Sequence, residues 1–155
     1  MTANHCDGCT MCCKLLDIAE LDKPKDKWCP DCVIGSGCAI YNARPAPCRD
    51  FACLWLESQT ASSPLPPGLR PDRSRVMLYF SEDRQAILGR CDPARPDAWR
   101  EEAVFNLLCL FSTKGMKVMF DNGRDHFAMD GPRARRVALS PPDSHGVRYF
   151  RKFLD

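Results

Sequence analysis

The chain has no long apolar run and few histidines, and both shortages narrow what it can be. Its 155 residues include three histidines, and no uninterrupted apolar stretch approaches the ~18 residues that a transmembrane helix needs. The segment from Met1 to Cys6 shows neither the basic region nor the apolar core of a secretory signal. We therefore expect a cytoplasmic protein that does not cross or bind a membrane.

The sequence also lacks the motifs of the common enzyme classes. It contains no phosphate-binding loop, no Ser, His and Asp in the order of a known catalytic triad, and no paired-carboxylate motif. The net charge is +2, with −2 on residues 1–60 and +4 on residues 61–155, and neither value is extreme enough to indicate nucleic acid. These absences leave catalysis undecided and favour a protein without enzyme activity.

Cysteine is the residue that the chain has in excess. Nine of the eleven cysteines lie in the first third of the chain. Two residues separate Cys6 from Cys9 and Cys9 from Cys12, Cys13 follows directly, and two residues again separate Cys29 from Cys32. Such spacing lets neighbouring sulfur atoms converge on one ion from a tight loop, as in zinc knuckles and iron–sulfur loops. The expected metal ligands are Cys6, Cys9, Cys12, Cys13, Cys29, Cys32, Cys38, Cys48 and Cys53.

Several metal chemistries remain open for this cluster. In a reducing compartment, clustered cysteines are more often metal ligands or redox groups than disulfides. The Cys9/Cys12 and Cys29/Cys32 pairs are 16 residues apart, a zinc-ribbon spacing, so zinc is the first expectation and these four are the first ligands. An iron–sulfur redox protein is the alternative, and metal storage or delivery a weaker one.

Adjacent cysteines add a constraint on how the ligands are shared. Successive side chains point apart, so Cys12 and Cys13 would serve two metals, or one of them would only pack. Nine thiols exceed the four ligands of one tetrahedral site, which leaves either two sites with a spare cysteine or a three-zinc cluster with bridging sulfurs. Six interleaved cations could offset the thiolate charge, namely Lys14, Lys23, Lys25, Lys27, Arg44 and Arg49.

Together with Gly37 to Tyr41, Arg44-Pro45 and Cys48-Arg49-Asp50-Phe51-x-Cys53, the first cysteine motif resembles the CxxCxxCC family of zinc- or iron-chelating proteins. The resemblance covers about the first 55 residues. It implies metal chelation through these cysteines, with the metal undecided and no settled activity.

The spacing of apolar residues indicates an α+β protein. We expect a small, irregular, Cys-rich lobe, stapled by metal, over residues 1–57 and a Pro/Ser-rich linker over residues 58–73. The linker would lead to a mixed lobe over residues 74–155 on which the first lobe packs, or the whole would form one compact domain. The second lobe would contain strands at 76–80 and 85–91, a hairpin around Asn122-Gly123, a strand at 137–139 and a terminal helical turn at 147–154. It would also contain a helix at 98–113, capped by Asp97 and stopped at Gly115, with Leu110 on the apolar face that packs on the core.

The remaining candidates have ordinary explanations. His5 is expected to be exposed, and Cys91 and Cys109 are expected to be buried apolar residues. Arg133, Arg135 and Arg136 form a basic cluster that we expect to be solvated, because no interleaved aromatics accompany it. We expect no nucleic acid partner, whereas an unidentified protein partner is compatible with the sequence.

Overall fold

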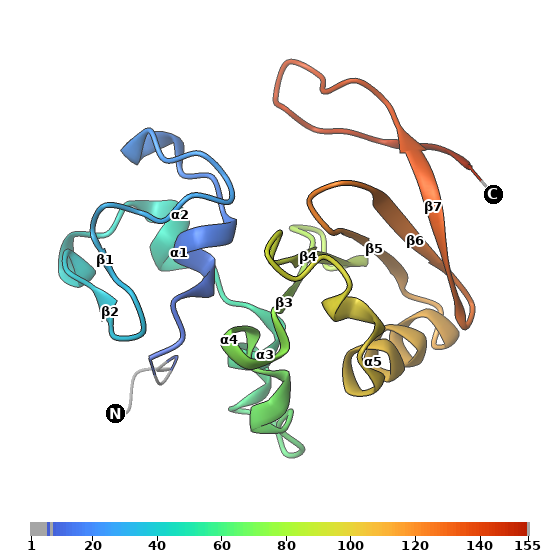
Figure 1. Cartoon of the computed structure of the whole chain (residues 1–155), viewed down its shortest axis with the longest axis horizontal. Helices are drawn as coiled ribbons and strands as arrows, with labels where there is room; N and C mark the ends of the chain where they lie inside the picture. Colours follow the sequence, from blue (N-terminus) through green and yellow to red (C-terminus); the bar gives the residue numbers. More distant parts are fainter. Residues whose placement is uncertain (1–5, 7, 155) are drawn as a thin grey trace. The chain divides into compact units, whose positions relative to one another are not determined.

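The computed structural model describes residues 6 and 8–154. The chain divides into two compact units, residues 1–79 and 80–155, drawn in Figure 1 from blue to red. Helices are combined with a small antiparallel sheet and a mixed six-stranded sheet, so the predicted α+β class is confirmed. No helix of the described chain is long and apolar enough to cross a bilayer.

The first unit is made of short pieces. Eight of the thirteen prolines lie in this unit, and together with the cysteine loops they interrupt the chain too often for long elements. Its elements are α1 (Met11–Leu15), η1 (Ala19–Leu21), β1 (Cys32–Val33), β2 (Gly37–Cys38), η2 (Tyr41–Ala43), α2 (Ala46–Asp50), α3 (Leu54–Ser58), η3 (Pro67–Leu69) and α4 (Pro71–Ser74).

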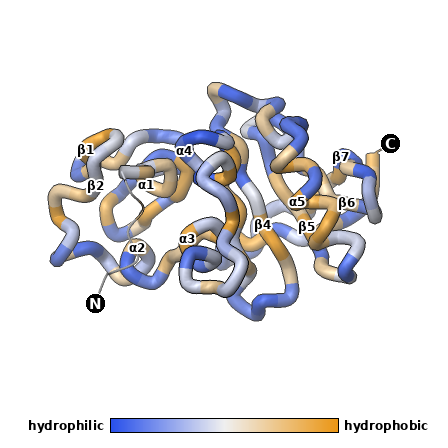
Figure 2. Tube along the Cα trace, turned by 90° about the horizontal axis from the view of Figure 1, so that it is seen from below, coloured by the Kyte–Doolittle hydropathy of each residue, from blue (hydrophilic) through white to orange (hydrophobic). Residues whose placement is uncertain are grey.

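A small apolar core holds these pieces together. Met11 and Leu15, one turn apart on α1, are buried with Met77. Phe51 and Tyr79 pack on this core edge to face, with ring centroids 5.5 Å apart. Figure 2 shows α1 as one of the hydrophobic segments of this unit. Other hydrophobic residues of the unit, such as Leu54 and Trp55 on α3, are also buried, so its apolar packing extends beyond α1.

The stretch at residues 58–73, expected to be a linker, lies within the first unit. The indole Nε1 of Trp55 donates to the carbonyl oxygen of Pro66 over 3.2 Å, and the backbone N–H of Leu65 donates to Ser58 Oγ over 3.0 Å. The stretch is therefore tied back onto α3 before it enters η3 and α4.

The six-stranded sheet has the order β3-β4-β5-β6-β7-β8. β4 and β5 are parallel, and η4 and α5 form the connection between them; β5 to β8 form an antiparallel meander. The elements are β3 (Val76–Phe80), β4 (Ala86–Cys91), η4 (Ala98–Arg100), α5 (Glu102–Thr113), β5 (Lys117–Asp121), β6 (His126–Asp130), β7 (Arg133–Leu139) and β8 (Phe150–Phe153).

Helix α5 lies against β5 and β6 and covers one face of the sheet. Side chains alternate between faces along a strand, and the helix-covered face carries Ile87, Val118, Phe120 and Phe127, all buried. Trp99 packs on this face, with its ring centroid 5.1 Å from Phe120 and 5.0 Å from Phe127. This aromatic cluster is the core of the second unit.

Short sequence motifs determine the helix end before β5 and the turn after it. Gly115, predicted to stop the helix, has φ of 91°, and the N–H groups of Gly115 and Met116 donate to the carbonyls of Ser112 and Phe111, a Schellman arrangement. In the predicted hairpin, Asn122 Oδ1 accepts from the N–H groups of Arg124 and Asp125. Both predictions are confirmed.

Three expectations for the second unit were wrong. Asp97 precedes the one-turn η4 without a side-chain cap, and α5 begins separately at Glu102. Leu110, expected on the buried helix face, is 47% exposed, whereas Leu108 is fully buried. The terminal segment is not a helical turn but strand β8, paired with β7 across a bulge.

Candidate metal centre

The first cysteines lie on a turn and on the short helix that follows it. The N–H of Cys9 donates to the carbonyl of Cys6 over 2.8 Å, which closes a tight loop at the first x2 spacing. Cys12 and Cys13 both belong to α1, where successive residues are 100° apart. The helix therefore turns two thiols in different directions within one turn.

Backbone hydrogen bonds bring the second knuckle to α1. The N–H of Cys29 donates to the carbonyl of Cys13 over 2.9 Å, and the N–H of Cys32 donates to the carbonyl of Cys29 over 3.1 Å. Cys32 is then paired with Cys38 across the β1–β2 ladder. Four cysteines from three separate stretches are thus connected through main-chain bonds alone.

The thiols themselves meet at Cys13. Its side chain hydrogen-bonds with the thiols of Cys12 and Cys32, and Cys32 is also hydrogen-bonded by the Thr10 hydroxyl. Sequence reasoning placed Cys13 last among the first ligands. The structure gives it a central position, which adjacency to Cys12 alone could not reveal.

Electrostatic interactions connect all nine cysteines of the cluster. Cys6 interacts with Cys53, Cys9 and Cys13, and Cys48 interacts with Cys13, Cys29 and Cys38. The remaining links are those among Cys12, Cys13, Cys29 and Cys32. Cysteines 42 or more residues apart in the sequence, such as Cys6 and Cys53, therefore share one neighbourhood within the first unit.

Burial and neighbouring cysteines raise the pKa values of several thiols of the cluster, including those of Cys6 and Cys32, and so favour their protonated form. Burial, followed by the nearby Cys53, raises the pKa of Cys6 to about 11, and burial beside Cys13 raises the pKa of Cys32 to about 11. The hydrogen bond with Cys12 is the main cause of the raised pKa of Cys13. Binding to a metal would require these protons to leave.

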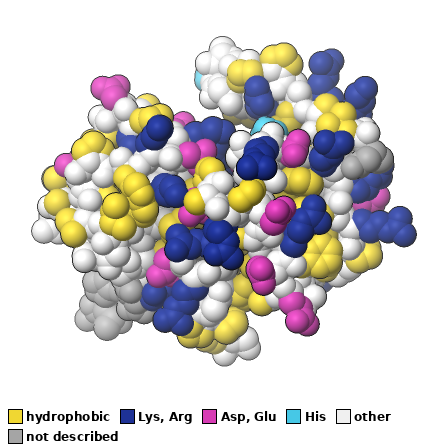
Figure 3. Space-filling view, in the orientation of Figure 1, with side chains coloured by type: hydrophobic (Ala, Val, Ile, Leu, Met, Phe, Trp, Pro, Cys, Tyr) yellow, Lys and Arg dark blue, Asp and Glu magenta, His cyan; other side chains and the backbone are white. Residues whose placement is uncertain are grey.

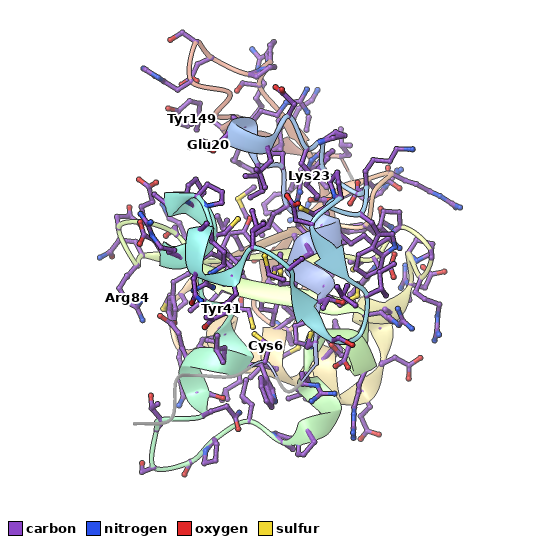
Figure 4. All side chains as sticks on the ribbon, turned by 90° about the vertical axis from the view of Figure 1, so that its left-hand side faces the viewer. Cys6, Glu20, Lys23, Tyr41, Arg84 and Tyr149 are labelled. Carbon is purple, nitrogen blue, oxygen red and sulfur yellow. The ribbon has the colours of Figure 1, made fainter. Side chains whose placement is uncertain are left out.

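One cation of the cluster is buried. Lys23 is 4% exposed, and its Nζ donates to the carbonyl oxygens of Lys14, over 2.7 Å, and Leu16 at the end of α1. Burial lowers the pKa of Lys23, while Cys13 and Cys29 act in the opposite direction. Figure 4 shows Lys23 and Cys6 on opposite sides of α1. A buried ammonium is costly unless it is compensated, and here the two carbonyl oxygens, together with the nearby carboxylates of Asp17 and Asp26, supply the compensation.

A second cation reaches other cysteines. The positive charge of Arg44 lowers the pKa values of Cys6 and Cys48. Its guanidinium lies 3.7 Å from the centroid of the Tyr41 ring, and its Nε donates to the Tyr41 carbonyl over 2.8 Å. Lys23 and Arg44 are therefore two members of the expected cation set that interact with thiols of the cluster.

The chemistry of the nine cysteines suits a metal, whereas the positions of their side chains in the structure do not. Thiols of this number, with two cations beside them, are chemically suited to zinc or iron. Across residues 6 and 8–154, no three Cys, His, Asp or Glu side chains stand together closely enough to hold one ion. Metal binding would therefore require the sulfur atoms to draw together around the ion.

The other sulfur and imidazole candidates lie elsewhere. Cys91 ends β4 and is 1% exposed, as predicted. Cys109 lies on α5 but is only half-buried, with Sγ 3.8 Å from the carbonyl oxygen of Pro132. His5 lies outside the described residues. His126 is on β6, and His145 is exposed in the segment that follows β7.

A close backbone approach also shapes the site. Gly8 has φ of 84°, and a Cβ there would lie 2.8 Å from the carbonyl oxygen of Gly35. The N–H of Gly35 in turn donates to Thr10 Oγ1 over 3.1 Å. The glycines bring the loop after β1 against the residues before α1. Glycine between two ligand cysteines was the only signal for this in the sequence.

Comparisons of the chain with protein-family models, with curated proteins and with solved structures found no match.

Proposed function

We propose that the protein is a metal-binding protein in which the nine cysteines from Cys6 to Cys53 hold zinc and thereby organise the first unit. The gathering of nine thiols from five stretches of chain into one electrostatic neighbourhood carries this proposal. Structural zinc sites of this kind contribute folding free energy directly. Their role here would be structural or in binding rather than catalytic.

The composition of the surroundings supports a charged, metal-bound cluster. The ammonium of Lys23 already donates to the carbonyl oxygens of Lys14 and Leu16, and nearby negative charge would further offset the cost of its burial. Thiolates bound to zinc would supply that charge, since a cluster with more thiolates than metal charge carries a net negative charge. A zinc cluster would add cohesion to the short elements that pack around Met11, Leu15 and Met77.

The resemblance of residues 6–53 to the CxxCxxCC family supports chelation and leaves open zinc or iron. The x2 pairs at Cys9/Cys12 and Cys29/Cys32 favour zinc. When bound, zinc would turn the thiols into thiolates and fix four of them around each ion.

The test is the metal content of untagged protein purified without oxygen, together with its visible spectrum. We expect two or three zinc ions per chain and no colour. A Cys29→Ser variant should lose at least one zinc, whereas the matched Cys109→Ser variant, on α5 of the other unit, should keep the full content.

A second measurement removes the metal from the wild-type protein. Complete extraction by a strong chelator should unfold the first unit, with loss of circular dichroism and a lower melting temperature. Metal-free protein with an unchanged melt would overturn the proposal. Iron with acid-labile sulfide would replace zinc by an iron–sulfur cluster and redirect the question to electron transfer.

A further inference from the structure

A second feature belongs to the second unit and lies on the last two strands of the sheet. β7 and β8 are antiparallel neighbours, and β8 is the final strand in the order. Residues 133–154 contain six basic residues and one acidic residue, a net charge of +5, although the whole chain carries only +2. The rest of the chain is therefore at −3, and positive charge is concentrated on this pair of strands, called here the β7–β8 edge.

Aromatic rings are interleaved with these cations. Tyr149 is 60% exposed and Phe150 is 47% exposed. Phe150 and Phe153 lie edge to face with centroids 5.2 Å apart, and the guanidinium of Arg135 on β7 lies 3.8 Å from the centroid of Phe153. The aromatics that the basic cluster lacks in the sequence are thus supplied by the neighbouring strand.

A bulge places the rings on a common side. Leu139 is paired with Phe150 and Val137 with Phe153, and the register shifts between them. Leu139 and Val137 are two residues apart and face the same way, so their partners do too. Phe150 and Phe153 would face opposite ways in a regular strand, but here they form one continuous apolar strip.

The acidic residue within the segment does not neutralise the exposed cations. Asp143 Oδ1 accepts hydrogen bonds from the N–H groups of His145 and Val147, and Oδ2 accepts one from the Tyr149 hydroxyl at 3.3 Å. Arg135 and Arg136 pair with Asp130 and Asp125, at 3.1 and 3.9 Å. Arg133, Arg148, Arg151 and Lys152 are exposed to solvent as well. Figure 3 shows Lys and Arg side chains along the right-hand edge, with hydrophobic atoms among them.

We propose that the β7–β8 edge binds single-stranded nucleic acid. Arg148 and Arg151 would contact phosphates, and Tyr149 and Phe150 would stack on bases. Single-strand binders combine cations that follow the backbone with exposed aromatic rings on a sheet, and the rings accept any base because every base has a planar face. In duplex DNA the base faces are covered by neighbouring bases, so a duplex would contact only the cations of the β7–β8 edge.

Charge and rings together select this ligand over other polyanions. An acidic peptide or an anionic membrane would be attracted by the same net charge of +5, but neither offers planar groups to stack on Tyr149 and Phe150. This proposal does not rest on the metal site, because every residue in it lies in the second unit.

The test measures binding of the full-length protein, with its metal content determined, to a fluorescent 20-nucleotide single strand by anisotropy over a range of salt. We expect binding that weakens as salt rises, and weaker binding of a duplex of the same length. The paired substitution Arg148→Gln/Arg151→Gln should lower the salt slope by roughly 1.4, about 0.7 for each lost phosphate contact. Tyr149→Leu should weaken binding about tenfold with an unchanged salt slope.

The matched control is Lys114→Gln/Arg124→Gln, which removes two exposed cations away from the edge and should leave both affinity and slope unchanged. An equal effect of the control, or no binding of the single strand at low salt, would overturn the proposal. So would tighter binding of the duplex, or binding to phosphatidylserine vesicles alone. Displacement of the strand by polyglutamate at equal charge concentration would show that charge alone accounts for binding. This outcome would also overturn the proposal.

Discussion

The ammonium nitrogen of Lys23 donates a 2.7 Å hydrogen bond to the backbone carbonyl oxygen of Lys14, in the last turn of α1. The same nitrogen also donates to the carbonyl of Leu16. A cation at this position satisfies carbonyls that have no partner within the helix, and it opposes the negative end of the helix dipole. One buried side chain thus holds the end of the helix that carries Cys12 and Cys13.

Replacing this lysine should destabilise the first unit. Lys23→Met keeps much of the apolar stem but removes both hydrogen bonds, and we expect a loss of about 2 kcal/mol in the free energy of unfolding. Lys25→Met is the control, because Lys25 is exposed two residues away. Urea denaturation followed by circular dichroism would measure both. Equal midpoints for the two variants would contradict the role of Lys23.

The two glycines that meet near the site give a second prediction. Gly8 and Gly35 have φ of 84° and 78°, so alanine at either position adopts a left-handed conformation at a cost of roughly 1 kcal/mol. Only at Gly8 would the new Cβ also clash, at 2.8 Å from a backbone oxygen. Gly8→Ala should therefore cost about 2 kcal/mol more than Gly35→Ala. Thermal melts that rank the two variants equally would argue against this close approach.

Helix α5 carries one buried and one exposed leucine, so the effects of replacing them can be compared. Leu108 is fully buried and Leu110 is 47% exposed. Leu108→Ala should lower the free energy of unfolding by about 3 kcal/mol, through lost burial and a cavity. Leu110→Ala should change it by less than about 0.5 kcal/mol. Chemical denaturation of both variants would show which face of α5 packs on the sheet. A larger loss of unfolding free energy in Leu110→Ala than in Leu108→Ala would contradict this orientation.

The buried thiol of Cys91 predicts a loss of stability in alkali. Burial raises its pKa from 9.0 to about 12, so the folded state favours the protonated thiol. This stabilisation is complete below about pH 9 and is lost as the pH rises from 9 towards 12, by up to about 4 kcal/mol. Cys91→Val removes the titration. The difference in unfolding free energy between wild type and variant should therefore change across this pH window, and a constant difference would refute the prediction.

Sequence reasoning succeeded where a local signal decides the structure. Asn122-Gly123 specifies its own turn because the Asn side chain bonds to the backbone within three residues. Strand β3 is read directly from Val76 to Phe80. The Schellman stop at Gly115 likewise depends on neighbouring residues only.

Sequence reasoning failed where a distant partner decides. Phe150 and Phe153 have the three-residue spacing of a helix face, but a bulge against β7 produces the same pairing of rings in a strand. If residues 147–154 form a helical turn, as the spacing predicts, their rings do not lie beside β7, and the cations of β7 have no aromatic neighbours. A register shift between two strands is set by both of them and cannot be seen in either alone.

The candidate site shows the same limit. Clustering of the nine cysteines is implied by their spacing, but the central place of Cys13 depends on the Cys29 N–H meeting its carbonyl. The burial of Lys23 depends on α1 ending beside it. Among six cations with similar sequence neighbours, nothing in the sequence distinguishes this one.

The single parallel pair in the sheet has a consequence for the order of folding. Neighbouring strands from β5 to β8 pair through hairpins, so their contacts can form as soon as each turn closes. Strand β4 can pair early with β3, its neighbour on the other side. Its pairing with β5 has to wait for α5, because the partner residues begin at Lys117, 26 residues after Cys91. At a synthesis rate of roughly 5–20 residues per second, β4 would spend at least about a second on the ribosome before β5 follows it. The Asn122–Gly123 turn is therefore the expected nucleus of the second unit, and a mutation there should slow folding more than one in β4.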